Sequence, residues 1–176
     1  MVSYTVRLAT RADLPALEWD GEFAHFRRLF AETYQQVEAG EALIWIAELS
    51  PHGIIGQIFV QLNGYHPELA AGNSRAYLYA FRVRSSFRKK GIGACILRVA
   101  EADLARRGYR QVAINVARDN EDARRLYERL GYCVVAAEAG EWSYLDQYGQ
   151  RQYVSEPAWR MEKELLKNLA NPTFPC

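Results

Sequence analysis

Hydrophobic residues follow two different spacings along this chain. The segments 42–49 (ALIWIAEL), 54–62 (IIGQIFVQL) and 75–83 (RAYLYAFRV) are short, rich in β-branched and aromatic residues and bounded by turn residues, which is typical of strands. In the segment 22–39, apolar side chains recur every three or four positions instead, and this spacing predicts an amphipathic helix. These apolar residues are Phe23, Phe26, Leu29, Phe30, Tyr34 and Val37.

The same two spacings account for the rest of the chain. Thr10 precedes a short segment with Asp13 three residues on, which indicates a capped helix start. Gly108 and Gly131 each follow a helical pattern and act as stop signals. We expect helices at 11–17, 22–39, 91–108 and 120–131, and strands at 4–9, 42–49, 54–62, 75–83, 109–116, 132–138 and beside the Tyr148-Gly149 turn.

The order of these elements, β-α-α-β-β-β-α-β-α-β-β, defines the fold class. No linker, repeat or low-complexity segment interrupts it, so we expect one α/β domain (α+β, with a mixed sheet) covered by helices. We place this domain at residues 1–166 and expect a loose tail at 167–176. The strand at 75–83 and the strand after the helix at 91–108 form a βαβ unit and should be parallel neighbours.

Composition narrows the classes of function. The chain has 176 residues, with 22 basic and 21 acidic side chains and a net charge of +1. A general nucleic-acid-binding protein would show a strong basic excess, so we expect no nucleic-acid partner. No apolar run approaches the roughly 18 residues of a membrane helix, and the first residues lack an apolar signal core. We therefore expect a cytoplasmic protein without a membrane partner, as either a monomer or a homodimer.

The cysteines and histidines give no evidence of a metal site. The three cysteines, Cys95, Cys133 and Cys176, are an odd number without close pairing, which makes a poor disulfide framework and suits a reducing compartment. No metal-ligand spacing occurs among the cysteines and histidines, so we expect no metal.

Positive charge is concentrated around the segment 87–96, which reads FRKKGIGACI. It lies where a helix is expected to begin, and a helix start presents free backbone N–H groups and a partial positive charge. Glycines let a ligand approach those groups, and the basic side chains add full charges, so the segment predicts a pyrophosphate-binding loop. The alternative is a surface helix capped by glycine, with lysines that serve solubility. The nearby basic residues are Arg82, Arg84, Arg88, Lys89 and Lys90.

Two motifs together point to a family. A Walker loop is absent, and a dinucleotide fingerprint would need a third glycine where Ile96 stands. The first motif is R-x-x-G-x-G, from Arg88 to Gly93, and the second, one strand later, is N-x-x-A-x-x-L-Y-x-x-x-G-Y over residues 120–132. In this order and spacing the motifs resemble those of the GNAT superfamily of acyl-CoA-dependent N-acyltransferases. The similarity extends over most of the chain.

This resemblance implies a fold, a reaction and a set of site residues. The fold is a mostly antiparallel sheet with one parallel βαβ pair that splays for CoA, flanked by about four helices. The reaction moves an acetyl group from acetyl-CoA, or another acyl-CoA, directly to a primary amine through a tetrahedral intermediate. Tyr127 matches the general acid. The matching cofactor-binding residues are Phe81, Arg82, Val83, Arg88, Lys89, Lys90, Gly91, Ile92, Gly93 and Asn120.

Some assignments stay open. Asn120 is also compatible with a plain helix N-cap, and Tyr127 with a packed side chain that takes no part in the reaction. Asn115 and Tyr77 stand where relatives that modify proteins carry a glutamate, so the general base is not identified. Other candidates for the base are Glu22, Tyr79, Glu141, Asp146 and Glu156.

Acceptor recognition should involve the segments 22–34, 63–74 and 142–153, which are rich in aromatic residues. One hypothesis is a cationic amine on an apolar body, held by aromatic and acidic side chains. An alternative function is a CoA-binding sensor or regulatory module without turnover. The presence of Tyr127 favours an enzyme.

Overall fold

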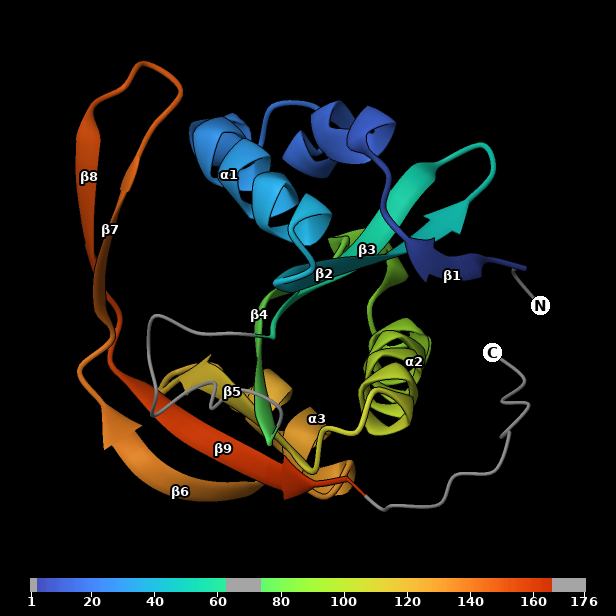
Figure 1. Cartoon of the computed structure of the whole chain (residues 1–176), viewed down its shortest axis with the longest axis vertical. Coiled ribbons are helices and arrows are strands. Elements are labelled where there is room, and N and C mark those ends of the chain that lie inside the picture. The colour runs from blue at the N-terminus through green and yellow to red at the C-terminus, as the bar shows by residue number, and fades with distance from the viewer. Residues whose placement is uncertain (1–2, 63–73, 166–176) are drawn as a thin grey trace.

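A seven-stranded mixed sheet forms the centre of the molecule, with the order β1-β2-β3-β4-β5-β9-β6 (Figure 1). The computed structural model describes residues 3–62 and 74–165. The strands of this sheet are β1 (Thr5–Leu8), β2 (Ala42–Leu49), β3 (Gly53–Gln61), β4 (Arg75–Val83), β5 (Gln111–Ala117), β6 (Cys133–Glu138) and β9 (Ala158–Glu164). A second sheet holds β7 (Glu141–Leu145) and β8 (Arg151–Ser155). The α-helices are α1 (Arg27–Glu38), α2 (Ile92–Arg106) and α3 (Glu121–Arg129), and the 3₁₀ helices are η1 (Arg11–Glu18), η2 (Ala24–Phe26) and η3 (Ser85–Phe87).

Strand β2 shows how both faces of the large sheet are buried. Its sequence is apolar at nearly every position, as is typical of a strand covered on both sides. Leu43 and Trp45 pack into the core that α2 covers, whereas Ile44 and Ile46 pack into a second core that α1 covers. Figure 1 shows α1 and α2 on opposite sides of β2.

The predicted fold class is confirmed. Neighbouring strands of the large sheet are antiparallel except β4 and β5, which are parallel and are joined through α2. The helices α1, α2, α3 and η1 match the expected number of about four. The predicted tail at 167–176 and most of the predicted acceptor loop at 63–74 lie outside the described residues.

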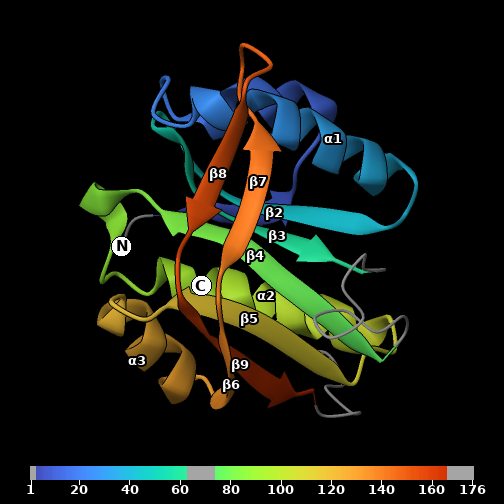
Figure 2. The ribbon, with the colours of Figure 1, turned by 90° about the vertical axis from the view of Figure 1, so that its left-hand side faces the viewer.

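The C-terminal strands differ from the prediction, because four strands rather than two follow α3. The long hairpin is one ribbon that bends where Gly140 faces Glu156 and Pro157. Pro157 has no N–H to donate to a ladder, and Gly140 has a φ of 67° and lies so close to the Glu156 carbonyl that a Cβ would collide with it. Beyond this bend, β7 and β8 leave the large sheet and extend towards α1 (Figure 2).

The segment after β1 is a 3₁₀ helix rather than an α-helix. Pro15 lies inside it, and proline lacks the N–H that an α-helical turn would use. The predicted capping at Thr10 is present, because the Asp13 carboxylate accepts hydrogen bonds from the backbone N–H and the hydroxyl of Thr10, at 2.7 and 3.0 Å.

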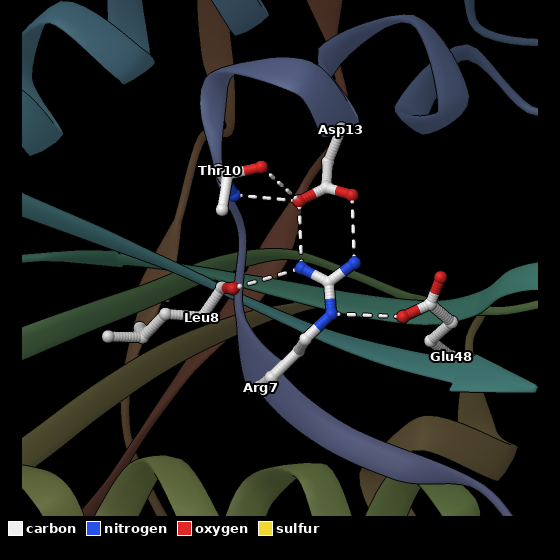
Figure 3. Close-up of polar contacts among 5 residues, drawn as sticks. All are labelled: Arg7, Leu8, Thr10, Asp13 and Glu48. Atoms are coloured by element: carbon white, nitrogen blue, oxygen red, sulfur yellow. Dashed lines mark hydrogen bonds and ion pairs between the residues drawn. The ribbon is translucent and has the colours of Figure 1, made fainter.

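One arginine fastens this 3₁₀ helix to the edge of the sheet (Figure 3). Arg7 of β1 donates two hydrogen bonds to the Asp13 carboxylate, at 2.8 and 2.9 Å, and a third to Glu48 of β2, at 2.9 Å. The bonds from Arg7, helped by those from Thr10, lower the pKa of Asp13 to about 2. The paired carboxylate is therefore the favoured form in the folded protein at neutral pH.

The cysteines depart from the sequence-based expectation. Cys133 on β6 is exposed and free, but Cys95 in α2 is disulfide-bonded. The number and spacing of the cysteines did not indicate this disulfide bond, because spacing along the chain does not report distance in space. Among the described residues, no helix is long and apolar enough to cross a membrane.

We predict that Asp13→Asn destabilises the protein by about 1–3 kcal/mol at neutral pH, since it removes the charge-assisted hydrogen bonds to Arg7. The unfolded-state pKa of Asp is about 3.9 and the folded-state value is about 2. The stabilisation is thus complete above pH 4 and is lost as the pH falls through 2. Urea denaturation at several pH values, followed by circular dichroism, measures the difference between the two proteins.

Glu48→Gln is the matched control, because Glu48 is more exposed than Asp13 and accepts one hydrogen bond from Arg7 rather than two. It should cost clearly less. An equal loss of stability for Asp13→Asn at pH 7 and at pH 2 would contradict this account of the Arg7 cluster.

Candidate active site

The site begins where two parallel strands part. Strands β4 and β5 are paired from Arg75 with Gln111 to Leu78 with Ile114. Both strands continue, β4 to Val83 and β5 to Ala117, but within these fully described strands no further pairing joins them. The edge of β4 that faces β5 thus offers backbone N–H and C=O groups to an extended ligand. Figure 2 shows β4 and β5 diverging towards the end of the molecule where α3 lies.

A β-bulge in β4 sets the direction of the side chains at this gap. Ala80 has a φ of 48°, and the register with β3 shifts between Gln57 and Phe59. Phe81 and Val83 then pack against the core under α2, while Arg82 turns to the face that α1 covers. The bulge therefore delivers one charged side chain to the face opposite α2.

The start of α2 forms the second wall. Gly91 is its N-cap residue with a φ of 82°, and Lys89 before it has a φ of 60°. The N–H groups of the first helical turn have no acceptor within the helix, and they carry the positive end of the helix dipole. Arg88 donates a hydrogen bond from Nε to the Val83 carbonyl at 2.9 Å, which ties the loop to the end of β4. The loop therefore presents free N–H groups and positive charge to the cleft, as an anion-binding loop does.

The two glycines of the first motif have different tasks. Gly91 lies in open space, and its positive φ favours glycine. A Cβ on Gly93 would instead come within 3.2 Å of the Phe81 ring, so this glycine lets α2 pack closely on β4. We had expected both glycines to keep the approach to the backbone clear, and Gly93 is explained first by packing.

Helix α3 supplies the third wall. Asn120 is its N-cap residue, and its side-chain oxygen accepts a hydrogen bond from the Ala123 N–H at 3.1 Å. Tyr127 is 4% exposed, and its ring centroid lies 6.2 Å from that of Phe81. Burial, together with the neighbouring Tyr77, raises the pKa of Tyr127 above that of free tyrosine. It is therefore a protonated phenol at neutral pH.

These three walls enclose one cleft of about 820 Å³. The predicted residues Lys90 and Ile92 are not on its wall: the Lys90 ammonium lies over the Phe87 ring, and the Ile92 side chain is buried in the core. The other predicted site residues all line the cleft, namely Phe81, Arg82, Val83, Arg88, Lys89, Gly91, Gly93, Asn120 and Tyr127.

Sequence reasoning missed several residues of the cleft. Arg125 and Arg129 line it from α3, one helical turn apart, and Phe23 lines it from before η2. The i,i+4 spacing of the two arginines on the motif-bearing helix was the available signal for them. Phe23 belongs to the segment 22–34, which we expect to take part in acceptor recognition, but the sequence does not single it out within that segment.

The face of the sheet towards α1 holds the residues considered for proton removal. Asn115 on β5 has a buried side-chain oxygen that finds no partner in the described part of the chain. Burial and the neighbouring Tyr79 raise the pKa of Tyr77 to about 12. Asp146 accepts hydrogen bonds from the backbone of Tyr148 and Gln150, so this carboxylate closes the hairpin turn and is not a free base.

Comparison with known proteins identifies the family to which this chain is similar. The model of the Acetyltransferase (GNAT) family matches residues 11–132. The uncharacterized N-acetyltransferase YycN of Bacillus subtilis is 23% identical over 134 residues, which cover 74% of this chain and 83% of that protein. The mycothiol acetyltransferase of Corynebacterium diphtheriae is 36% identical over 70 residues, covering 40% of this chain and 23% of that protein. The crystal structure of the ribosomal-protein-S18-alanine N-acetyltransferase from Escherichia coli superposes with a TM-score of 0.70 at 19% identity, covering 98% of this chain and 100% of that one.

We predict that Asn120→Ala costs about 1 kcal/mol of stability, because it removes the cap of α3. Asn120→Asp should keep the stability, since a carboxylate oxygen accepts the same hydrogen bond and suits a helix N-terminus. Urea denaturation of the three proteins measures this. Equal stability of the Ala and Asp variants would mean that the cap contributes nothing.

Proposed function

The chain belongs to the GNAT acetyltransferase family and is an N-acetyltransferase, and on that premise we propose that it moves an acetyl group from acetyl-CoA directly to a primary amine, with Tyr127 as general acid. The comparisons confirm the family that the two sequence motifs indicated. The single observation that best supports the proposal is the placement of the Tyr127 phenol in one cleft with the α2 N-terminus and the unpaired edge of β4.

The cofactor residues would act mainly through the backbone. The free N–H groups from Lys89 to Gly93 would bind the pyrophosphate of CoA, and the positive φ of Gly91 shapes the loop for that contact. The free edge of β4 from Phe81 to Val83 would pair with the pantetheine arm as an added strand does. The Asn120 oxygen is used by its own helix, so its amide group is what remains for a cofactor.

Proton transfer to the leaving group is the task proposed for Tyr127. The amine nitrogen forms a bond to the thioester carbon, and the carbonyl oxygen becomes an oxyanion that backbone N–H groups at the β4 bulge would stabilise. When the carbon–sulfur bond breaks, the thiolate takes the proton of the Tyr127 hydroxyl, and the proton lost by the amine restores the phenol. A buried phenol with a raised pKa stays protonated until that moment.

Removal of the amine proton would be assisted by water rather than by a carboxylate. The buried oxygen of Asn115 is an acceptor that could orient a water molecule at the gap between β4 and β5. Glu22, Glu141 and Glu156 are exposed, and burial raises the pKa of Tyr79, so the structure favours none of them as a base at neutral pH.

Release of CoA thiol from acetyl-CoA, measured over a panel of small amines and peptides, tests the proposed reaction. We expect turnover with at least one amine. Because an acetyl group replaces an amine hydrogen, the product should be heavier than the amine by about 42 Da. Calorimetric titration with CoA reports binding separately. Tight CoA binding without turnover on any amine would favour the sensor module instead.

We expect Tyr127→Phe to lower kcat more than tenfold while the affinity for acetyl-CoA changes little, because the substitution removes only the proton donor. Steady-state kinetics and calorimetry measure the two quantities. Tyr132→Phe is the matched control: Tyr132 is buried beside Tyr127, but its hydroxyl donates to Glu101 at 2.7 Å, outside the cleft. It should lower stability and leave kcat nearly unchanged, and an unchanged kcat for Tyr127→Phe would remove Tyr127 from the mechanism.

A further inference from the structure

Arg82 is the unusual charged group of the cleft. Its side chain leaves β4 on the face towards α1, where its guanidinium carbon lies 4.2 Å from the Phe23 ring centroid and 5.2 Å from that of Phe26. The Nη1 atom is fully buried and has no hydrogen-bond partner among the described residues. A buried donor that bonds to nothing costs stability, and such groups often await a ligand.

Two residues further along, Arg84 shows what a satisfied arginine looks like here. It also lies over an aromatic ring, that of Trp19, at 5.1 Å. Unlike Arg82, it donates to the Ile54 carbonyl at 2.9 Å and pairs with Asp20 at 3.1 Å. It is not on the wall of the cleft, whereas Arg82 is. Arg84, outside the cleft, thus has hydrogen-bond partners, whereas Arg82, on the wall of the cleft, keeps one donor without a partner among the described residues.

The charge of Arg82 is also available. Burial lowers the pKa of Arg82 to about 10, and Glu22 and Glu156 oppose this shift, so the group stays charged at neutral pH. Both glutamates are exposed, and in the described part of the chain neither comes within ion-pair distance of it. The protein therefore holds a cation in a half-buried aromatic setting without a close counter-charge.

This arrangement speaks against a cationic acceptor group at this point. Phe23 and Phe26 were candidates to hold the acceptor's positive charge, but they already face the guanidinium of Arg82. A second cation there would be repelled by Arg82. An anion would instead pair with the open donor while the rings hold the guanidinium plane.

We infer that Arg82 binds a carboxylate of the acceptor, so that the substrates are amines that carry a carboxylate near the amino group, as amino acids do. A carboxylate suits the site better than a phosphate, because it brings one negative charge and two oxygens to a single planar fork. Glu22 and Glu156 lie beyond ion-pair distance but close enough to raise the pKa of Arg82, and they would repel a dianion more strongly than a single carboxylate. The inference rests on the proposed function, whose acceptor it specifies.

The position of Arg82 makes this a specificity contact rather than a cofactor contact. Its neighbours Phe81 and Val83 point to the α2 side, while Arg82 points to the opposite face, where η2 and β7 meet. Phe26 of η2 contacts Tyr144 of β7 there, with ring centroids 4.8 Å apart. A carboxylate on Arg82 would fix the acceptor beside the gap from which its amine must attack.

The test compares matched acceptors in the intact protein. Acetyl-CoA turnover is measured with a set of amino acids and with their carboxamides, which keep the amine and side chain but lose the charge. The wild-type protein should show a kcat/KM about ten- to a hundredfold higher for the carboxylates, the range expected for a charged hydrogen bond. Equal values for carboxylates and carboxamides would overturn the inference without any variant.

Two substitutions assign the preference to the side chain. Arg82→Gln should raise KM for the carboxylates and bring the ratio of kcat/KM between each carboxylate and its carboxamide to about one, since neither acceptor can then use the guanidinium. Arg82→Lys, which keeps the charge but not the fork, should lose only part of the preference. Arg84→Gln is the control and should keep all of it. A preference that survives in Arg82→Gln, or a large loss of CoA affinity alone, would overturn the assignment.

A binding measurement separates this inference from the proposed reaction. Calorimetry of CoA-saturated protein with N-acetylphenylalanine and with its carboxamide should show binding of the acid that depends on Arg82, even if no amine is turned over. Succinyl-CoA with a neutral amine covers the other source of a carboxylate, the acyl group. Turnover of succinyl-CoA that depends on Arg82 and exceeds that of acetyl-CoA would place the anion on the donor and refute the acceptor assignment.

Discussion

The parallel pairing of β4 and β5 ends after Leu78 and Ile114. The three walls of the cleft, formed by the end of β4, the start of α2 and helix α3, lie around this point. Strand β3 continues to pair with the other edge of β4 as far as Val83, so β4 stays paired on one edge while its second edge is open. Parallel strands need a helical crossover, and this crossover brings the N-terminus of α2 to the point where the strands part. The free edge and the helix dipole therefore come from one supersecondary unit.

The bulge at Ala80 determines which side chains of β4 face each side of the gap between β4 and β5. One extra residue in β4 reverses the direction of its later side chains, so Phe81 and Val83 close the apolar side and Arg82 opens the polar side. The cost is a residue at positive φ, Ala80, whose carbonyl accepts a hydrogen bond from the buried Gln57 amide at 3.5 Å. Strain at one backbone position thus puts Phe81 and Val83 on one face of β4 and Arg82 on the other, which are the faces proposed for the cofactor and for the acceptor.

Much of this architecture could be predicted from the sequence, because it depends on local patterns. The features that depend on contacts between distant segments could not be predicted. The strands and helices carry strong local periodicity, and the motif at 88–93 lies on a turn whose conformation glycine largely dictates. The site residues on the two motif-bearing elements could be placed for the same reason. The 3₁₀ form of η1 depended on Pro15, and the break of the last hairpin depended on a contact between Gly140 and Glu156 that no local pattern reveals. The segment that holds Phe23 was expected at the acceptor side, but its contact with Arg82 and the open donor of Arg82 could not be foreseen, because the two residues lie 59 positions apart (82 − 23 = 59).

Because of the bend at Gly140 and Pro157, the second sheet is a separate hairpin that can vary independently of the large sheet. Within residues 3–62 and 74–165, strands β7 and β8 pair with each other and with no other strand, and the ribbon joins the main sheet at this bend. Changes in length or side chains beyond it would leave the cofactor-binding half untouched while reshaping the wall that Tyr144 presents to Phe26. On the proposed function, a lineage built on this scaffold would change its acceptors by exchanging this hairpin, while the residues proposed for acetyl transfer stay the same.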